Sequence, residues 1–167
     1  MQQHTISVLV ANKSGVLARI AGLFCGRGYN IDSLTVSPTD HTDTSKMTIV
    51  TTGVDSVIEQ IDKQLSKLID VIKVTDLTGS NFIERELALI KVETTKTTRS
   101  DIIQITEIFA GKIVNVHVDE ITAELSGRGD KVDAFVTMME PFGIIELART
   151  GKVAVCRNPG ATNKQSN

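Results

Sequence analysis

Tryptophan is absent from the sequence, and tyrosine and phenylalanine contribute only one and five of the 167 residues. Proteins that bind single-stranded nucleic acid usually combine exposed aromatic side chains with a basic surface. The formal net charge of −2 supplies no broad positive field for such a surface. We therefore expect no nucleic acid partner, although the RNA-recognition motif shares the element order predicted below.

Cysteine and histidine are also scarce, with two and three residues respectively. Cys25 and Cys156 are far apart in the chain, and the three histidines are scattered. Metal ligands usually come in closely spaced clusters, so we expect no metal site. Both cysteines have apolar neighbours, which predicts buried free thiols.

Long apolar runs are missing as well, and none approaches the ~20 residues needed to span a bilayer. The N-terminal residues MQQHTISVLV lack the order of charged, apolar and small residues that is typical of a signal peptide. The expectation is a cytoplasmic protein with no membrane partner.

The first 78 residues alternate between the hydrophobic periods of strands and helices. Ile6, Val8 and Val10 share one face of a predicted strand, and the apolar stripe after Gly15 predicts a helix. The predicted elements are a strand over 5–11, a helix over 15–27, strands over 30–37 and 46–53, a helix with a capping box at Ser56 and Glu59, and a strand over 70–77. This order is βαββαβ.

The same order begins again in the second half of the chain. We predict strands over 85–94, 112–119, 120–127 and 144–149, helices opening at Ser100 and covering 130–140, and an extra strand over 152–157. A shift of 85 positions places residues 20–31 over 105–116 with several identities, which indicates two related units. We predict an α+β protein of two ferredoxin-like units, 1–78 and 84–157, joined by a linker over 79–83 and followed by a flexible tail over 158–167.

Residues 12–15, NKSG, separate the first strand from the first helix. Asparagine and serine often cap helices and glycine is common in turns, so the stretch could be a capping turn alone. Alternatively, the free N–H groups at the helix start suit a carboxylate, which a glycine would allow to approach. Asn12 can both donate and accept hydrogen bonds, which suits an amino acid. The 85-residue shift places Thr97 and Ser100 at the positions of Asn12 and Gly15, so the second half does not repeat the motif.

Several segments resemble the small regulatory subunit of acetolactate synthase, also called acetohydroxyacid synthase. They are NKSGVLARIAGLFCGRGYNIDSLTVSPT at 12–39, TEIFAGKIVNV at 106–116 and IIELARTGKVAV at 144–155. The likeness covers nearly the whole chain apart from about ten C-terminal residues. Lys13 departs from the acidic residue often found at that position in the family.

The resemblance implies that residues 1–78 form an ACT domain, an amino-acid-binding module, in a homodimer. It implies that valine, the feedback inhibitor of branched-chain amino acid biosynthesis, binds between the ACT domains of two protomers. The implied binding residues are Asn12, Gly15, Val16 and Leu17 of one protomer with Asn30 and Ile31 of the other. Dimerisation could pair either the strand over 5–11 or the hairpin strands edge to edge.

The resemblance also implies that catalysis belongs to a separate large subunit, which this chain activates. Thiamine diphosphate, Mg²⁺ and FAD are expected in that catalytic partner, and no cofactor is expected here. The sequence itself contains no recognisable nucleophile and base spacing, no GxGxxG and no phosphate-binding GxxxxGK[ST], so we predict no catalytic residues. A free-standing ACT-domain sensor that regulates another enzyme is the alternative.

Overall fold

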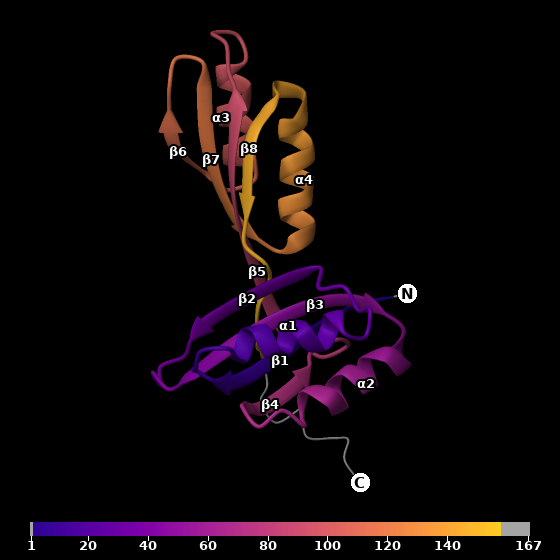
Figure 1. Cartoon of the computed structure of the whole chain (residues 1–167). Coiled ribbons are helices and arrows are strands. Elements are labelled where there is room, and N and C mark those ends of the chain that lie inside the picture. The colour runs from indigo at the N-terminus through magenta and orange to yellow at the C-terminus, as the bar shows by residue number, and fades with distance from the viewer. Residues whose placement is uncertain (1, 158–167) are drawn as a thin grey trace. The chain divides into compact units, whose positions relative to one another are not determined.

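The computed structural model describes residues 2–157, which form two compact units (Figure 1). Among these described residues, the first unit comprises residues 2–83 together with residues 151–157, and the second is Glu84–Thr150. No helix in the described part of the chain is long and apolar enough to cross a membrane.

The first unit has the predicted βαββαβ order. Its elements are β1 (Gln2–Ala11), α1 (Val16–Cys25), β2 (Ser33–Pro38), β3 (Thr44–Gly53), α2 (Asp55–Leu65) and β4 (Val71–Asp76). The four strands form an antiparallel sheet in the order β2-β3-β1-β4. β1 is therefore an interior strand and cannot pair edge to edge with a second chain, whereas β2 of the hairpin and β4 are the edge strands of the sheet.

The core of the first unit lies between this sheet and its two helices. Ile6, Val8 and Val10 are buried on one face of β1, as the alternation predicts. From α1 the core receives Val16, Ile20 and Phe24, whereas Leu17 is 41% exposed. Neighbouring helical positions point about 100° apart, so only one of Val16 and Leu17 can face the sheet.

The second unit repeats the ferredoxin-like arrangement and confirms the predicted fold class. Its elements are β5 (Phe82–Glu93), α3 (Arg99–Ile108), β6 (Lys112–Val116), β7 (Glu120–Gly127), α4 (Gly129–Met139), the 3₁₀ turn Glu140–Phe142 and β8 (Ile144–Arg149). The strand order is β6-β7-β5-β8, and the extra strand β9 (Val153–Cys156) pairs with β5.

The two units share irregularities that establish how their residues correspond. The register of β1 against β4 shifts between Leu9 and Val10, and that of β5 against β8 shifts between Lys91 and Val92. Asn12 N donates to Asp43 O at 2.7 Å, and Thr94 N donates to Asp119 O at 2.8 Å. Thr94 is therefore the counterpart of Asn12.

The predicted correspondence of Asn12 with Thr97 and Gly15 with Ser100 is wrong. The residue that caps α1 is Gly15 and the one that caps α3 is Thr98, so the second loop has one more residue between strand and cap. A shift without gaps cannot represent that insertion.

The predicted capping box at Ser56 is also wrong. Ser56 is not a cap, because α2 already begins at Asp55.

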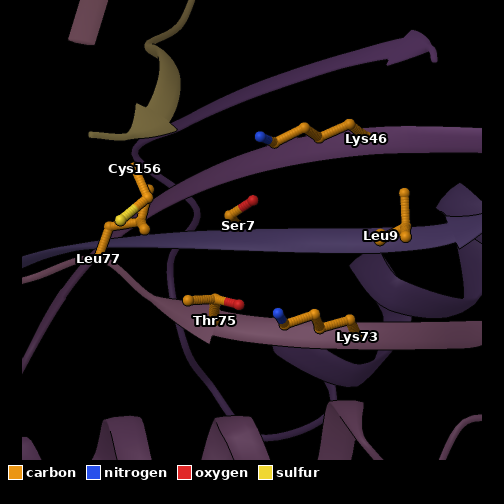
Figure 2. A pocket seen from close by; sticks show the side chains of 7 residues that line it. All are labelled: Ser7, Leu9, Lys46, Lys73, Thr75, Leu77 and Cys156. Carbon is orange, nitrogen blue, oxygen red and sulfur yellow. The ribbon is translucent and has the colours of Figure 1, made fainter. Parts of the chain in front are cut away.

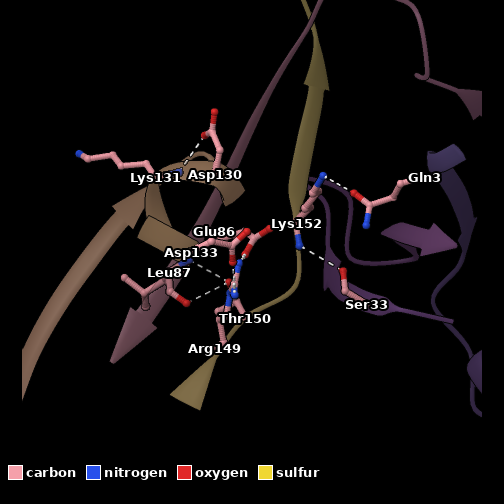
Figure 3. A network of polar contacts seen from close by, with 10 residues as sticks. All are labelled: Gln3, Ser33, Glu86, Leu87, Asp130, Lys131, Asp133, Arg149, Thr150 and Lys152. Atoms are coloured by element: carbon pink, nitrogen blue, oxygen red, sulfur yellow. Dashed lines mark hydrogen bonds and ion pairs between the residues drawn. The ribbon is translucent and has the colours of Figure 1, made fainter. Parts of the chain in front are cut away.

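The unit boundary differs from the one expected from sequence. Phe82 and Ile83, expected in a linker, already belong to β5, and the chain from Gly151 groups with the first unit rather than with 84–157. Lys152 explains the second difference, since its Nζ donates to Gln3 Oε1 at 3.0 Å (Figure 3). The predicted tail over 158–167 lies outside the described residues.

The cysteine prediction is confirmed in part. Neither Cys25 nor Cys156 forms a disulfide, but Cys25 is exposed and Cys156 is partly exposed, so the expectation of buried thiols is wrong. Cys25 is the last residue of α1, and its side chain points about 100° away from that of Phe24, which takes the core position.

One carboxylate inside the second unit is held by an arginine. Arg149 of β8 donates through Nη2 and Nε to Glu86 Oε2 at 2.7 and 2.9 Å, and through Nη1 to Asp133 at 2.7 Å (Figure 3). Burial acts to lower the pKa of the Arg149 guanidinium, but the hydrogen bonds to Glu86 and Asp133 outweigh it and raise that pKa. Glu86, only 7% exposed, thereby keeps a compensated charge.

Candidate functional site

The start of α1 is an open helix N-terminus formed by the loop that leaves β1. Gly15 occupies the N-cap position with φ 84° and ψ −11°, a left-handed conformation that favours glycine. No side chain caps the helix. The interpretation of residues 12–15 as a side-chain capping turn is therefore excluded, although the loop does turn the chain.

Two backbone donors at this helix start are available to a ligand. Leu17 N–H and Ala18 N–H make no hydrogen bond within residues 2–157, and Val16 N reaches Lys13 O only at 3.5 Å. A Cβ built on Gly15 would meet no atom within 4 Å, so the space beside these amides is open. Free N–H groups and the positive end of the helix dipole together favour an anion such as a carboxylate.

Asn12 stands beside this helix start with two of its donors already engaged. Its backbone N–H and its Nδ2 donate to Asp43 O and Thr42 O, the latter at 2.9 Å, which ties the loop to the turn between β2 and β3. The Oδ1 atom remains as an acceptor on an exposed side chain. Lys13, also exposed, adds a positive charge to the same loop.

Asn30 and Ile31 lie at the other end of the first unit's sheet. Asn30 O accepts a hydrogen bond from Thr51 Oγ1 at 2.6 Å near the end of β3, and Asn30 Nδ2 donates to Asp32 at 2.8 Å. Ile31 is half-buried against the core. Thr44 and Thr51 are seven positions apart, which corresponds to about 23 Å of strand. The structure thus brings Asn12, Gly15, Val16 and Leu17 together, and leaves Asn30 and Ile31 apart from them within one chain.

In the corresponding loop of the second unit, threonine side chains accept hydrogen bonds from the backbone of the same loop. Thr95 N donates to Thr98 Oγ1 at 2.9 Å, and Thr98 N donates to Thr95 Oγ1 at 3.2 Å. Arg99 Nη2 donates to Val118 O at 2.6 Å and further ties the helix start to the neighbouring turn. Thr98 has a φ of −91°, so no left-handed residue opens this end. Neither helix start has a side-chain cap, so the two loops differ in the residue at the cap position, a left-handed glycine in the first unit and a threonine in the second.

A separate hollow on the sheet of the first unit was not indicated by the sequence. Lys46 of β3 and Lys73 of β4 extend on either side of Ser7 of β1, with Thr75 beside Lys73 on β4, in a cavity of about 220 Å³ (Figure 2). Amino and hydroxyl groups would suit an anion. Alternation along each strand could have shown that these residues face outward. Which of them come together across the three strands depends on the pairing register of the strands, which the sequence does not reveal.

Metal coordination finds no support in the described residues. Between residues 2 and 157 no group of three or more His, Cys, Asp or Glu side chains is arranged to hold a metal ion. The chemistry that the α1 start offers is recognition of a small zwitterion, with amides for its carboxylate and amide oxygens for its ammonium.

Two family models match the chain, one in each unit. Residues 6–73 match a model described as an AHAS small subunit-like ACT domain, and residues 85–158 match one described as the small subunit of acetolactate synthase. All four implied helix-start residues, together with Asn30 and Ile31, fall inside the first match.

Relatives with high identity cover almost the entire chain. A probable acetolactate synthase small subunit of Archaeoglobus fulgidus is 54% identical over 155 residues, covering 93% of this chain and 97% of the relative. The acetolactate synthase small subunit of Aquifex aeolicus is 52% identical, covering 94% of this chain and 82% of the relative. A crystal structure of the small subunit from Thermotoga maritima has a TM-score of 0.87 and 41% identity, covering 95% of this chain and 99% of that one.

Proposed function

The chain belongs to the acetolactate synthase small subunit family, and on that premise we propose that it activates a catalytic large subunit and makes it sensitive to valine. The small-subunit role itself follows from relatives that match the chain over nearly its full length. The chemistry of branched-chain amino acid biosynthesis, with thiamine diphosphate, Mg²⁺ and FAD, belongs in this proposal to the large subunit.

The observation that carries the valine proposal is the uncapped N-terminus of α1. In this proposal the valine carboxylate accepts hydrogen bonds from Leu17 N–H and Ala18 N–H, where no side chain competes. Gly15 keeps the approach open, because an added Cβ would project into the empty space beside these amides. The second unit has Thr98 at the equivalent cap position, so in this proposal a side chain stands where Gly15 leaves the approach to the first helix open.

The ammonium end of valine requires acceptors, which the asparagines supply in this proposal. Asn12 directs its Nδ2 to Thr42 O, and Asn30 directs its Nδ2 to Asp32, so each retains Oδ1 for the ligand. A buried ammonium without such partners would cost several kcal/mol. A branched-chain amino acid therefore binds only where both asparagines are present.

One chain cannot supply both asparagines, which favours a homodimer. Asn12 and Asn30 lie near opposite ends of β3, so the acceptor near Asn12 comes from Asn30 of the partner subunit, next to Ile31 of the partner subunit. β2 is an edge strand with exposed Val36, and α1 exposes Leu17, so this side of the unit has apolar surface for a two-fold contact. Bound valine then favours one arrangement of the two chains, and a coupling of about 1–3 kcal/mol would be enough for regulation.

Reconstitution tests the proposal. The purified chain is added to the purified catalytic subunit from the same source, and acetolactate formation from pyruvate is measured with and without valine. We expect the chain to raise the rate and valine to remove that gain. Activation without any valine effect would contradict the effector assignment, and no activation at all would favour the free-standing sensor.

A further inference from the structure

A second polar cavity lies at the opposite end of β1 from Asn12. His4 and Asn12 are eight residues apart, which corresponds to about 26 Å of extended chain. The cavity has a volume of about 450 Å³, and its lining includes His4 of β1, Asp55 and Asp62 of α2, and Asp76 of β4. None of these residues belongs to the proposed valine site.

His4 is the unusual residue of this cavity, because it is buried and lacks hydrogen bonds. The residue is 3% exposed, and neither ring nitrogen has a hydrogen-bond partner among the described residues. Nε2 lies 3.5 Å from Asp55 Oδ1, and Nδ1 lies 3.6 Å from Asp76 Oδ2. Each ring nitrogen thus faces a carboxylate at a distance longer than an ordinary hydrogen bond. Buried polar groups are seldom left in this state unless a partner completes them.

The cavity also carries an excess of negative charge. Asp55, Glu59 and Asp62 follow one another at helical spacing along α2, and Asp76 faces them from β4. The lining contains no lysine or arginine, and Lys63 pairs with Glu59 at 3.9 Å. Burial, and secondly the charge of Asp76, raise the pKa of the Asp62 carboxyl above its ordinary value. A positively charged ligand would relieve the repulsion among these carboxylates.

The size and arrangement of the cavity favour an organic cation over a metal ion. No three acidic, histidine or cysteine side chains within residues 2–157 are placed to coordinate a metal, and a volume of about 450 Å³ accommodates a molecule. We propose that this cavity binds a small organic cation with primary ammonium groups, whose N–H groups donate to the Asp55 and Asp76 carboxylates beside His4.

Calorimetric titration of the full chain with putrescine, a primary diamine, tests this proposal. At low ionic strength we expect saturable binding that added salt weakens by screening. Asp55→Asn should weaken binding about tenfold, the equivalent of one charge-assisted hydrogen bond. Asp130→Asn is the matched control, because Asp130 occupies the first turn of α4 as Asp55 occupies that of α2, and it should bind putrescine like the unmodified chain.

A second measurement keeps the proposal testable if a variant is unstable. Nuclear magnetic resonance of the unmodified chain should show the His4 ring signals shifting with putrescine, while those of exposed His41 stay in place. Three results would overturn the proposal: no saturable putrescine binding, equal effects of Asp55→Asn and Asp130→Asn, or equal binding of tetramethylammonium, which has no N–H donor. Failure of valine to bind would leave this test unaffected, since the two sites are at opposite ends of β1.

Discussion

Replacing Gly15 with aspartate should abolish the valine response without unfolding the first unit. The left-handed backbone of Gly15, with φ 84°, costs a residue with a side chain about 1–2 kcal/mol. No clash adds to that strain, because a Cβ at this position meets nothing within 4 Å. A negative charge at a helix N-terminus stabilises the fold by about 0.3–1 kcal/mol. This offsets part of the backbone strain, so the net loss of stability is small.

The same substitution should weaken valine binding strongly. The substitution puts a carboxylate near the proposed position of the valine carboxylate, and two carboxylates about 5 Å apart repel by about 3 kcal/mol at an effective dielectric constant of about 20, or roughly two orders of magnitude in Kd. Gly15→Asn is the control, because asparagine has nearly the same shape and no charge.

The assay measures thermal unfolding of each variant and the valine concentration that half-inhibits the reconstituted enzyme. Gly15→Asp should melt no lower than Gly15→Asn and should still activate the catalytic subunit, yet require far more valine. The reasoning is refuted if the two variants respond equally to valine, or if Gly15→Asp responds like the unmodified chain.

Three further predictions follow from the structure. Asn30→Ala should weaken valine binding about tenfold in calorimetry, whereas Asn115→Ala, an exposed asparagine of β6, should leave it unchanged. Arg149→Met should lower the urea-unfolding free energy by about 3 kcal/mol because Glu86 loses its partner, and adding Glu86→Leu should recover most of it; no recovery would contradict the ion-pair account. Asp62→Asn should raise the melting temperature at neutral pH, because the raised pKa means that the charged carboxylate destabilises the fold above that pKa. The difference in melting temperature between Asp62→Asn and the unmodified chain should shrink as the pH falls through the folded-state pKa toward 3.8. A difference that grows as the pH falls would refute the raised pKa of Asp62.

The fold was predictable because local patterns agree with it at most positions. Alternation at Ile6, Val8 and Val10 predicts a face that the structure buries completely. Strand order was not accessible in this way, since nothing within β1 reveals that it pairs on both sides with β3 and β4. The insertion before Thr98 was also hidden, because a fixed shift along the sequence cannot show where one loop gains a residue.

The helix-start residues were predictable as a local motif, because strand, loop and helix follow one another in the chain. The separation of Asn12 from Asn30 depends on long-range pairing of β3 and could only be read from the structure. The cavity at His4 was likewise missed, since Asp55 and Asp76 come from distant elements. The available signal was that His4 continues the inward alternation of Ile6 and Val8.

A crystal structure of the full chain grown with valine tests the central claim most directly. We predict that the valine carboxylate oxygens lie about 2.7–3.2 Å from Leu17 N and Ala18 N, with the ammonium between Asn12 Oδ1 and Asn30 of the partner subunit. Valine bound elsewhere, with the start of α1 empty, would contradict it.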